Sequence, residues 1–381
     1  MKSVAILTFH NACNYGAFLQ AYALMKTLQS FPDTDAYILD YQANAIKNAY
    51  QVREIMHQKG KAINKAISMI LRMNDIKKRN AMFRKMQDQC FRFKRRGLNR
   101  SELASVVDDY DAFIVGSDQV WNLALTSYDE TFLLDFVNEP LKKYSYSASI
   151  GNEKIPDRDS EILSMHLKEF HRLSVRETGA AMALKDLLKR EISVHIDPVF
   201  LFPMREWIKL ARKQTERDDQ NYILLFVMGI SKREKYLVEL AEEIAQKSGL
   251  PVVYLTDQER WFKYRQFIHA GIITPQEFIT FIMNAKLVIT NSFHGTAFSI
   301  LMHTDFLVDT GVARNVRIKN LLNLVGLEKN GICAENKDVS INTISENQWK
   351  MVDDAISCER EKAMSFLADI ISEIHKGDEQ R

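Results

Sequence analysis

The sequence lacks the features that mark disulfide-rich, metal-binding and membrane-spanning proteins. Its 381 residues include four cysteines, at positions 13, 90, 333 and 358, with no Cys-x-x-Cys pair. We therefore expect neither a disulfide framework nor a metal site. No apolar run approaches the about 18 residues that a membrane span needs. The first residues enter a strand pattern directly, with no signal-peptide core, so we expect a cytoplasmic protein.

Nucleotide-binding signatures are absent too. The chain contains neither a Gly-x-Gly-x-x-Gly turn nor a Walker A sequence, and we expect no bound cofactor. The composition, 46% hydrophobic and 26% charged, is that of a globular protein. The length favours two domains, each large enough for its own core.

Positive charge is concentrated in one segment. The net charge is only +2, yet residues 53–100 hold fifteen Lys or Arg against three Asp or Glu, a difference of +12. Apolar residues recur there at helical spacing, which predicts an amphipathic helix (Met56, Ile63, Ile67, Ile70 and Met73). Such a helix can dock on an anionic membrane or face a phosphate-bearing substrate, although a solvated helical insertion is commoner. No nucleic-acid-binding module accompanies the charge, so nucleic acid is not an expected partner.

Strand patterns alternate with helical patterns along most of the chain, which predicts an α/β fold with parallel sheets covered on both faces. A strongly polar stretch that ends near residue 220 separates two such runs. We expect an N-terminal domain over 1–205 with the basic insertion at about 45–100, a C-terminal domain over 221–335, and helices over 340–381 that pack back on the first domain. Two doubly wound, Rossmann-like domains facing a cleft resemble the GT-B glycosyltransferase architecture.

The most informative segment joins a buried strand to a helix. Leu287–Thr290 is predicted as the strand, and Phe293–Met302 as a helix that Asn291 or Ser292 can cap. His294 then lies in the first helical turn, beside free backbone N–H groups and the positive end of the helix dipole. That position suits an anionic ligand together with a proton-transfer group. A histidine here can equally be a surface residue or the partner of a backbone carbonyl.

Two other predicted strand ends carry polar residues. In the first, Gly16 permits close backbone approach at a helix start, and Asn14 can cap that helix. In the second, residues 116–122 (Gly-Ser-Asp-Gln-Val-Trp-Asn) offer carboxylate, amide and aromatic groups, which suit a sugar, and Asp118 can act as a base. The same residues can instead form a capped loop with Trp121 in the core.

Cationic side chains follow two further strands. Arg176 can grip a carboxylate or phosphate with two parallel hydrogen bonds, or it can pair with Glu177 or Asp197. Arg317 and Lys319 open a later helix, where they can contribute to an anion pocket.

Taken in order, these segments resemble the polysaccharide pyruvyl transferase family. The matching pieces run from residue 3 to about 327: Asn14-Tyr-Gly-Ala with Gln20-Ala-Tyr-Ala-Leu24, Gly116-Ser-Asp-Gln-Val-Trp-Asn122, Tyr146-Ser-Ala-Ser-Ile-Gly151, Ser174-Val-Arg-Glu177, Asp197-Pro198, Ser292-Phe-His-Gly295 and Arg317-Ile-Lys319. Each piece is weak alone, but the ordered set is specific. The resemblance implies transfer of the enolpyruvyl unit of phosphoenolpyruvate onto a sugar of a bacterial surface-polysaccharide precursor, which gives a pyruvate ketal and phosphate.

The resemblance also implies roles for individual residues. His294 is the expected general acid, and Asp118 is a weaker candidate for the base. The donor phosphoenolpyruvate is expected at helix starts and cations: Asn14, Gly16, Arg176, Ser292, Gly295, Arg317 and Lys319. The acceptor sugar is expected at Tyr15, Gln20, Ser117, Gln119, Trp121 and Asn122. A lipid-linked acceptor would bring the protein to the inner membrane face.

One departure from the family pattern matters. Many relatives carry Arg-Leu-His where this chain has Phe293 before His294. The donor phosphate is therefore expected to rely on Arg176, Arg317 or Lys319. Three alternatives stay open: a nucleotide-sugar glycosyltransferase of the same architecture, a non-catalytic saccharide- or anion-binding protein, and a transferase that acts on a small molecule or peptide.

Overall fold

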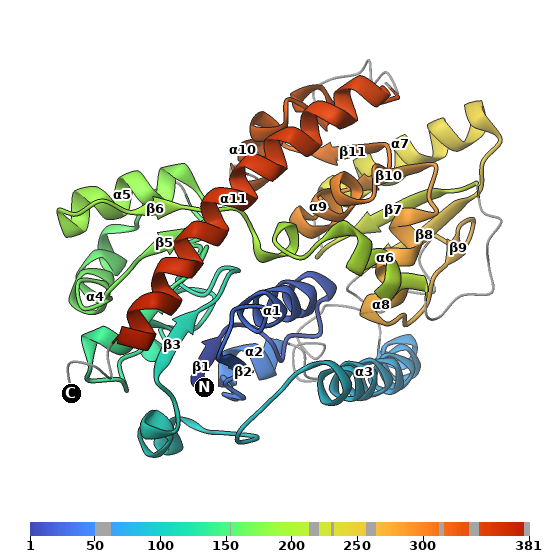
Figure 1. Ribbon diagram of the computed structural model, residues 1–381. Coiled ribbons are helices and arrows are strands. Elements are labelled where there is room, and N and C mark those ends of the chain that lie inside the picture. The colour runs from blue at the N-terminus through green and yellow to red at the C-terminus, as the bar shows by residue number, and fades with distance from the viewer. Residues whose placement is uncertain are drawn as a thin grey trace.

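Two parallel sheets and one long C-terminal helix make up the framework (Figure 1). The structure, a computed structural model, describes residues 1–49, 62–152, 154–212, 221–229, 232–256, 264–311, 316–334 and 343–376. In the described part of the chain, none of the helices combines the length and the apolar character that a bilayer crossing requires.

The N-terminal half is built on a sheet of four parallel strands in the order β2-β1-β3-β4. These are β1 (Lys2–Leu7), β2 (Thr34–Ile38), β3 (Ala112–Val115) and β4 (Lys143–Ser145). A parallel pair, β5 (Ser174–Val175) and β6 (Ser193–Val194), continues the sheet through a bridge between Ala148 and Val175. The helices of this half are α1 (Tyr15–Leu28), α2 (Asn44–Ala49), α3 (Ala62–Cys90), α4 (Asp157–Leu167) and α5 (Thr178–Leu188), with 3₁₀ turns η2 (Arg100–Asp109), η3 (Glu130–Leu133), η4 (Pro140–Lys142) and η5 (Pro198–Phe200).

The C-terminal half contains a six-stranded parallel sheet in the order β12-β11-β10-β7-β8-β9. Its strands are β7 (Ile223–Val227), β8 (Val252–Thr256), β9 (Ile268–His269), β10 (Leu287–Thr290), β11 (Phe306–Asp309) and β12 (Gly331–Ile332). Its helices are α6 (Met204–Arg212), α7 (Lys232–Ser248), α8 (Pro275–Met283), α9 (Phe293–Leu301) and α10 (Val316–Val325), with the 3₁₀ turn η7 (Glu328–Asn330). The central strands β7 and β10 are buried throughout, as expected for strands covered on both faces.

Both sheets reverse their strand order at one place. In the first sheet the chain steps from β1 to β2 on one side and to β3 and β4 on the other. In the second it steps from β7 to β8 and β9, then crosses to β10, β11 and β12. Diverging connections leave a crevice beyond the carboxyl ends of the two central strands, which is where α/β proteins bind ligands. The topology therefore creates one crevice beyond β1 and β3 and another beyond β7 and β10.

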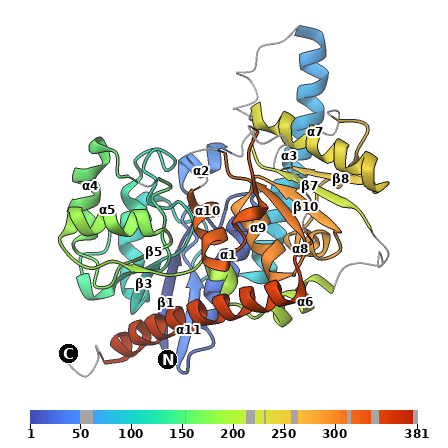
Figure 2. The same cartoon turned by 90° about the horizontal axis from the view of Figure 1, so that it is seen from above.

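The C-terminal helix α11 (Glu346–Lys376) runs across both halves, as the two views in Figures 1 and 2 show. Near its middle, Arg360 Nε donates to the carbonyl oxygen of Phe200 at 2.7 Å. Near its end, Glu373 pairs with Arg172, which lies just before β5. The helix thus braces the N-terminal half, and α10 of the C-terminal half packs against it.

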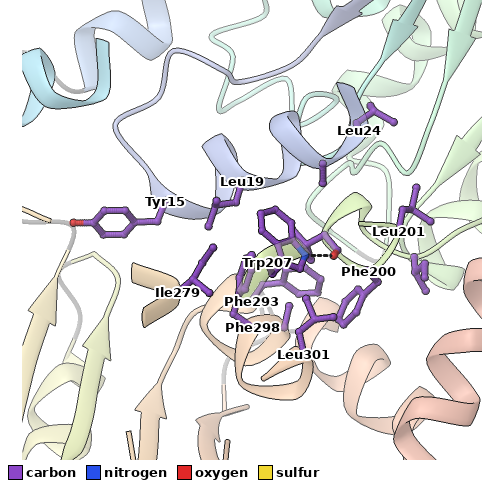
Figure 3. Packing of buried hydrophobic residues seen from close by; sticks show 14 of the residues in the cluster. Tyr15, Leu19, Leu24, Phe200, Leu201, Trp207, Ile279, Phe293, Phe298 and Leu301 are labelled. Carbon is purple, nitrogen blue, oxygen red and sulfur yellow. Dashed lines mark hydrogen bonds between the residues drawn. The ribbon is translucent and has the colours of Figure 1, made fainter. Parts of the chain in front are cut away.

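A shared hydrophobic core joins the two halves beneath α1 (Figure 3). Tyr15 of α1 stacks on Phe278 of α8 with ring centroids 4.9 Å apart. Trp207 packs edge-on against Phe298 of α9 at 5.1 Å, and its indole N–H donates to the Val199 carbonyl at 3.0 Å. Because α1 contributes to this core, the first crevice is held in a fixed position against the second.

The described part of the basic helix α3 packs against this core. Arg79 is only 5% exposed, and its guanidinium lies over the Tyr15 ring at 5.4 Å. Lys77 and Lys78 point to solvent. Four of the apolar residues that predicted an amphipathic helix, at positions 56, 63, 67 and 70, lie outside the residues whose side chains the structure describes.

Most elements follow the sequence predictions. β10 begins and ends where predicted, α9 ends one residue earlier than predicted, and one long helix, α11, lies within the helical segment predicted over 340–381. The short edge strands β9 and β12 escaped prediction, because two residues give no periodic pattern. The strands of the two sheets fall on either side of the junction predicted between residues 205 and 221, whose position stays a prediction.

Candidate active site at the carboxyl ends of the strands

The two crevices open into one cavity of about 230 Å³. Asn14 reaches it from the connection between β1 and α1, and Asp118 reaches it from the loop after β3. From the other half come Met228 after β7 and His294 in α9. Four strand ends therefore supply the walls, and residues far apart in the sequence meet there.

His294 is held where the starts of two helices meet. Ser292 caps α9, because its Oγ accepts a hydrogen bond from the Gly295 N–H at 3.2 Å. The His294 ring lies against the start of α1, and a Cβ added to Gly16 would come within 2.0 Å of His294 Nδ1. Glycine at position 16 is what allows this approach. Asn14 caps α1, so the positive ends of both helix dipoles lie beside the cavity.

Asn291 fixes the junction between the two central strands of the second sheet. Its Oδ1 accepts from the Met228 N–H at 2.7 Å, and its Nδ2 donates to the Met228 carbonyl at 3.0 Å. The pair of bonds ties the end of β10 to the end of β7. The start of α9 is thereby placed on a rigid base.

Asp197 is the buried anchor of the site. Its Oδ2 accepts from Arg176 Nη1 at 2.6 Å and from Ser117 Oγ at 2.9 Å. The same oxygen lies 3.6 Å from His294 Nε2, which is too long for a hydrogen bond. Its Oδ1 accepts from the backbone N–H of Val199 at 3.1 Å. Asp197 thus connects the ends of β3, β5 and β6 to the start of α9.

These contacts set the charges of the site. Burial alone would raise the Asp197 pKa, but the His294 ring, Arg176 and the Val199 N–H together hold that pKa below its usual range. Burial tends to lower the Arg176 pKa, yet Glu177 and Asp197 raise it overall. Burial and repulsion from Arg176 lower the Arg317 pKa. Asp197 and Arg176 therefore stabilise each other as ions, whereas Arg317 carries a charge that its surroundings compensate poorly.

Phe293 separates this cavity from a second one of about 290 Å³, and it lines both. The Arg176 guanidinium lies 4.5 Å from the centre of the Phe293 ring, and that of Arg317 lies at 5.9 Å. Arg317 also lines both cavities. Its Nε is buried and has no hydrogen-bond partner among the described residues. Arg317 is thus the cation most available to a ligand in the described part of the site.

Asp118 has an unusual backbone conformation. Its φ of 80° lies in the left-handed region, which non-glycine residues adopt at a cost of about 1–3 kcal/mol. Its carbonyl accepts from the N–H groups of Val120 and Ser149 at 2.8 and 3.0 Å, which holds the turn in place. This conformation allows the sharp turn after β3, and the turn places Asp118 and Gln119 on the cavity wall.

Several residues predicted for the acceptor are instead part of the core. Trp121 is 1% exposed, and its indole N–H donates to the Phe132 carbonyl at 3.0 Å, so it offers no face to a sugar. Gln20 is fully buried and donates to Thr8 Oγ1. Tyr15, also buried, belongs to the core between the halves. These three side chains lie in the core and do not line the cavity, because helix α1 and the loop after β3 turn them away from it.

Four other predicted site residues also do not line the 230 Å³ cavity. Ser117 is buried as a partner of Asp197, and Asn122 donates to Gln119 Oε1 at 3.1 Å without lining the cavity. Gly295 serves packing, because a Cβ there would lie 2.8 Å from Thr290 Oγ1. Lys319 is exposed and lines neither cavity. It follows Arg317 by two positions, and residues so spaced point to nearly opposite sides of a helix.

The sequence patterns missed three residues as members of the site. Asp197 and Glu177 were considered only as partners for Arg176, and Asn291 only as a helix cap. Asp197 follows β6 and precedes Pro198, so its position at a strand end was a usable signal. The convergence of this strand end with His294 depends on how the halves pack, which no local pattern reveals.

Comparison with known proteins decides the family. The profile of the polysaccharide pyruvyl transferases matches residues 14–308, which is most of the chain. This chain belongs to the polysaccharide pyruvyl transferase family. The match spans Asn14, Asp118, Asp197 and His294, while Arg317 and α11 lie beyond it. A search of curated protein sequences found no significant match.

Solved structures show the fold. A UDP-GlcNAc 2-epimerase from Methanocaldococcus jannaschii is 13% identical, with a TM-score of 0.51 and coverage of 97% of this chain and 99% of that one. The enzyme of the same name from Neisseria meningitidis is 10% identical, with a TM-score of 0.51 and coverage of 98% and 99%. MnaA of S. aureus, solved with UDP, is 11% identical, with a TM-score of 0.53 and coverage of 96% and 90%. The chain therefore has the GT-B fold, as the sequence predicted.

Proposed function

We propose that this chain transfers the enolpyruvyl unit of phosphoenolpyruvate to a sugar of a surface-polysaccharide precursor, forming a pyruvate ketal and releasing phosphate. The observation that carries the proposal is the pairing of family membership with the 230 Å³ cavity. There His294 and the poorly compensated Arg317 lie beside two helix starts.

The charges favour this cavity for the donor. Phosphoenolpyruvate carries a phosphate and a carboxylate, so its pocket must supply positive potential. Arg317 and the first turns of α1 and α9 supply it, since the first N–H groups of a helix have no intrahelical partner. Arg176 is already neutralised by Asp197 and Glu177, so we assign it to positioning.

We assign proton transfer to His294. Protonation of the methylene carbon of the donor makes the adjacent carbon electrophilic. A sugar hydroxyl then attacks that carbon, its proton passes to a base, and the carbon–oxygen bond to phosphate breaks. A second hydroxyl of the same sugar then attacks the carbon that phosphate has left, its proton passes to the released phosphate or to water, and the ketal is complete. The Asp197 carboxylate lies 3.6 Å from His294 Nε2, so a carboxylate faces the ring that we assign to proton transfer. Asp118, which lines the same cavity, is the candidate base.

The test is phosphate release from phosphoenolpyruvate that depends on an acceptor sugar, with mass spectrometry of the sugar product. His294→Gln is expected to lower turnover by about 10²–10⁴-fold, the usual contribution of a positioned acid. His303→Gln is the matched control, because His303 is a partly exposed histidine that pairs with Asp353. Wild-type turnover by His294→Gln would show that another group supplies the proton.

A nucleotide-sugar glycosyltransferase is the second candidate, because the similar solved structures include proteins named for UDP-GlcNAc and one solved with UDP. Calorimetric titration separates the two. We expect binding of phosphoenolpyruvate that Arg317→Met weakens. Tight binding of a UDP-sugar, with no response to phosphoenolpyruvate, would favour the glycosyltransferase.

A further inference from the structure

The second cavity lies on the other side of Phe293 and is bordered by the C-terminal helix at Glu359. Its walls come from the ends of β5 and β6, from α10, and from Glu359 of α11. At about 290 Å³ it lies close to the lower end of the range for small-molecule pockets, about 300 Å³. The donor proposal above gives it no role.

Buried polar atoms without partners gather around this cavity. Arg176 Nη2, Glu177 Oε2 and Arg317 Nε have no hydrogen-bond partner among the described residues. Both ring nitrogens of His195 are in the same condition. All four side chains line the cavity. Buried polar groups are normally hydrogen-bonded, so this concentration indicates a place where a polar ligand supplies the missing bonds.

The chemistry of these groups fits hydroxyls. Burial lowers the His195 pKa to about 4, so its ring is neutral at pH 7 and offers one donor and one acceptor. The guanidiniums donate, and the free Glu177 oxygen accepts. A hydroxyl group both donates and accepts, so a ring with several hydroxyls can satisfy this mixed set. Phe293 adds aromatic surface for the C–H face of such a ring, whereas Phe200 is fully buried.

The charges exclude an anion as the preferred ligand. Among the described residues that line the cavity, the carboxylates of Glu177, Asp197 and Glu359 outnumber the guanidiniums of Arg176 and Arg317. The net charge of these five groups is −1, which opposes a phosphate and is tolerable for a neutral sugar. The 230 Å³ cavity, lined by Arg317, His294 and Asp118, has no such excess of acid.

We propose that the 290 Å³ cavity binds the neutral sugar ring of the acceptor. The assignment of the ring as an acceptor rests on the proposed function, while the saccharide pocket itself does not. Phe293 and Arg317 line both cavities, so the two substrates would approach each other across these side chains. Phe293 then lies at the border that a sugar hydroxyl must pass to reach the donor carbon.

Two leucines on the cavity walls offer a matched pair of variants. Leu324 lines the 290 Å³ cavity and is 37% exposed, and Leu125 lines the 230 Å³ cavity and is 45% exposed. Because both are partly exposed, tryptophan at either position can fill its cavity without entering the core. Binding of galactose, glucose, mannose and N-acetylglucosamine, at up to about 100 mM, is measured by saturation-transfer NMR, since weak sugar affinities fall in the millimolar range.

We expect Leu324→Trp to weaken sugar binding about tenfold or more and to leave the Kd for phosphoenolpyruvate within about twofold of wild type. Leu125→Trp should weaken phosphoenolpyruvate binding about tenfold or more and leave sugar binding within about twofold of wild type. His195→Phe keeps the ring that stacks on Tyr146 but removes the nitrogens, and it should weaken sugar binding about two- to tenfold.

The outcomes separate the two proposals. Sugar binding that Leu324→Trp abolishes supports the pocket even if no phosphate is released from phosphoenolpyruvate, in which case only the proposed function fails. Sugar binding unchanged in Leu324→Trp, or no binding by any of the four sugars, overturns the pocket whether or not phosphate is released. Displacement of a bound sugar by inorganic phosphate alone would identify an anion site and also overturn it.

Discussion

Replacing Arg317 by methionine should weaken donor binding without destabilising the protein. The guanidinium lies beside a like charge on Arg176, and both burial and that repulsion lower the Arg317 pKa. Its Nε has no hydrogen-bond partner among the described residues. Methionine keeps an unbranched apolar chain against Phe293 and removes the unfavourable charge.

The expected magnitudes follow from these contacts. A hydrogen bond to a charged group is worth about 1.5–3 kcal/mol, so the Kd for phosphoenolpyruvate should rise about 10- to 150-fold. The free energy of unfolding should be unchanged or higher, because a charge without a compensating partner is removed. Binding and stability therefore move in opposite directions.

Arg176→Met is the contrasting variant. It leaves the carboxylates of Asp197 and Glu177 buried without their partner, and breaking a buried pair of this kind costs about 3–5 kcal/mol. The two arginines flank the same phenylalanine ring, so the comparison isolates the effect of pairing.

The assay is urea denaturation of both variants, together with calorimetric titration of phosphoenolpyruvate into Arg317→Met and wild type. A loss of more than about 1 kcal/mol of unfolding free energy in Arg317→Met would refute the argument from uncompensated charge. Wild-type affinity for phosphoenolpyruvate in that variant would refute its role in donor binding.

Three further predictions concern packing, pH and the membrane. Gly16→Ala should lower the free energy of unfolding by about 1–3 kcal/mol and lower turnover, because the new Cβ would collide with His294. A second change of His294 to alanine should recover the stability, and an unaltered melting temperature in the single variant would exclude the clash. Burial holds the pKa of His195 at about 4 in the folded protein, against about 6.5 in the unfolded chain, so the unfolded state binds more protons between these pH values. About 3 kcal/mol of unfolding free energy should therefore be lost as the pH falls from about 6.5 to about 4. Denaturation at several pH values should show this loss in wild type and not in His195→Gln. Reversing the charges of the exposed Lys77 and Lys78 should weaken binding to phosphatidylserine vesicles by about 1 kcal/mol or more per residue, and unchanged sedimentation with vesicles would remove the membrane proposal.

Local patterns were sufficient for the elements that carry the site. The apolar run of β10, the serine cap of α9 and the glycine at position 16 each act within a few residues. Their physical effects, strand burial, capping and close backbone approach, are therefore visible in sequence. Helix α10 shows where local patterns stop being sufficient. Arg317 and Lys319 look equivalent in the sequence, but they lie on different sides of the helix, so that Arg317 lines the cavity and Lys319 is exposed.

The reasoning from sequence failed where a side chain had two chemically reasonable positions. Trp121 and Gln20 have groups that suit a sugar, but those groups also suit a buried hydrogen bond. In the structure both side chains are buried in the core and donate hydrogen bonds there. For Asp197 the sequence prediction underestimated the role of the side chain. Its carboxylate looked like a local partner for one arginine, and the structure makes it the hub that joins Arg176, Ser117 and the neighbourhood of His294.

The sequence by itself determined the alternation of strands and helices, the family, and the placement of His294 at a capped helix start, because each depends on neighbours within a turn or a strand. Only the tertiary structure decided which polar groups share a cavity, which are neutralised by pairing, and that Phe293 divides two pockets. Those properties depend on the packing of two sheets and one C-terminal helix, whose contacts join residues 97 and 160 positions apart.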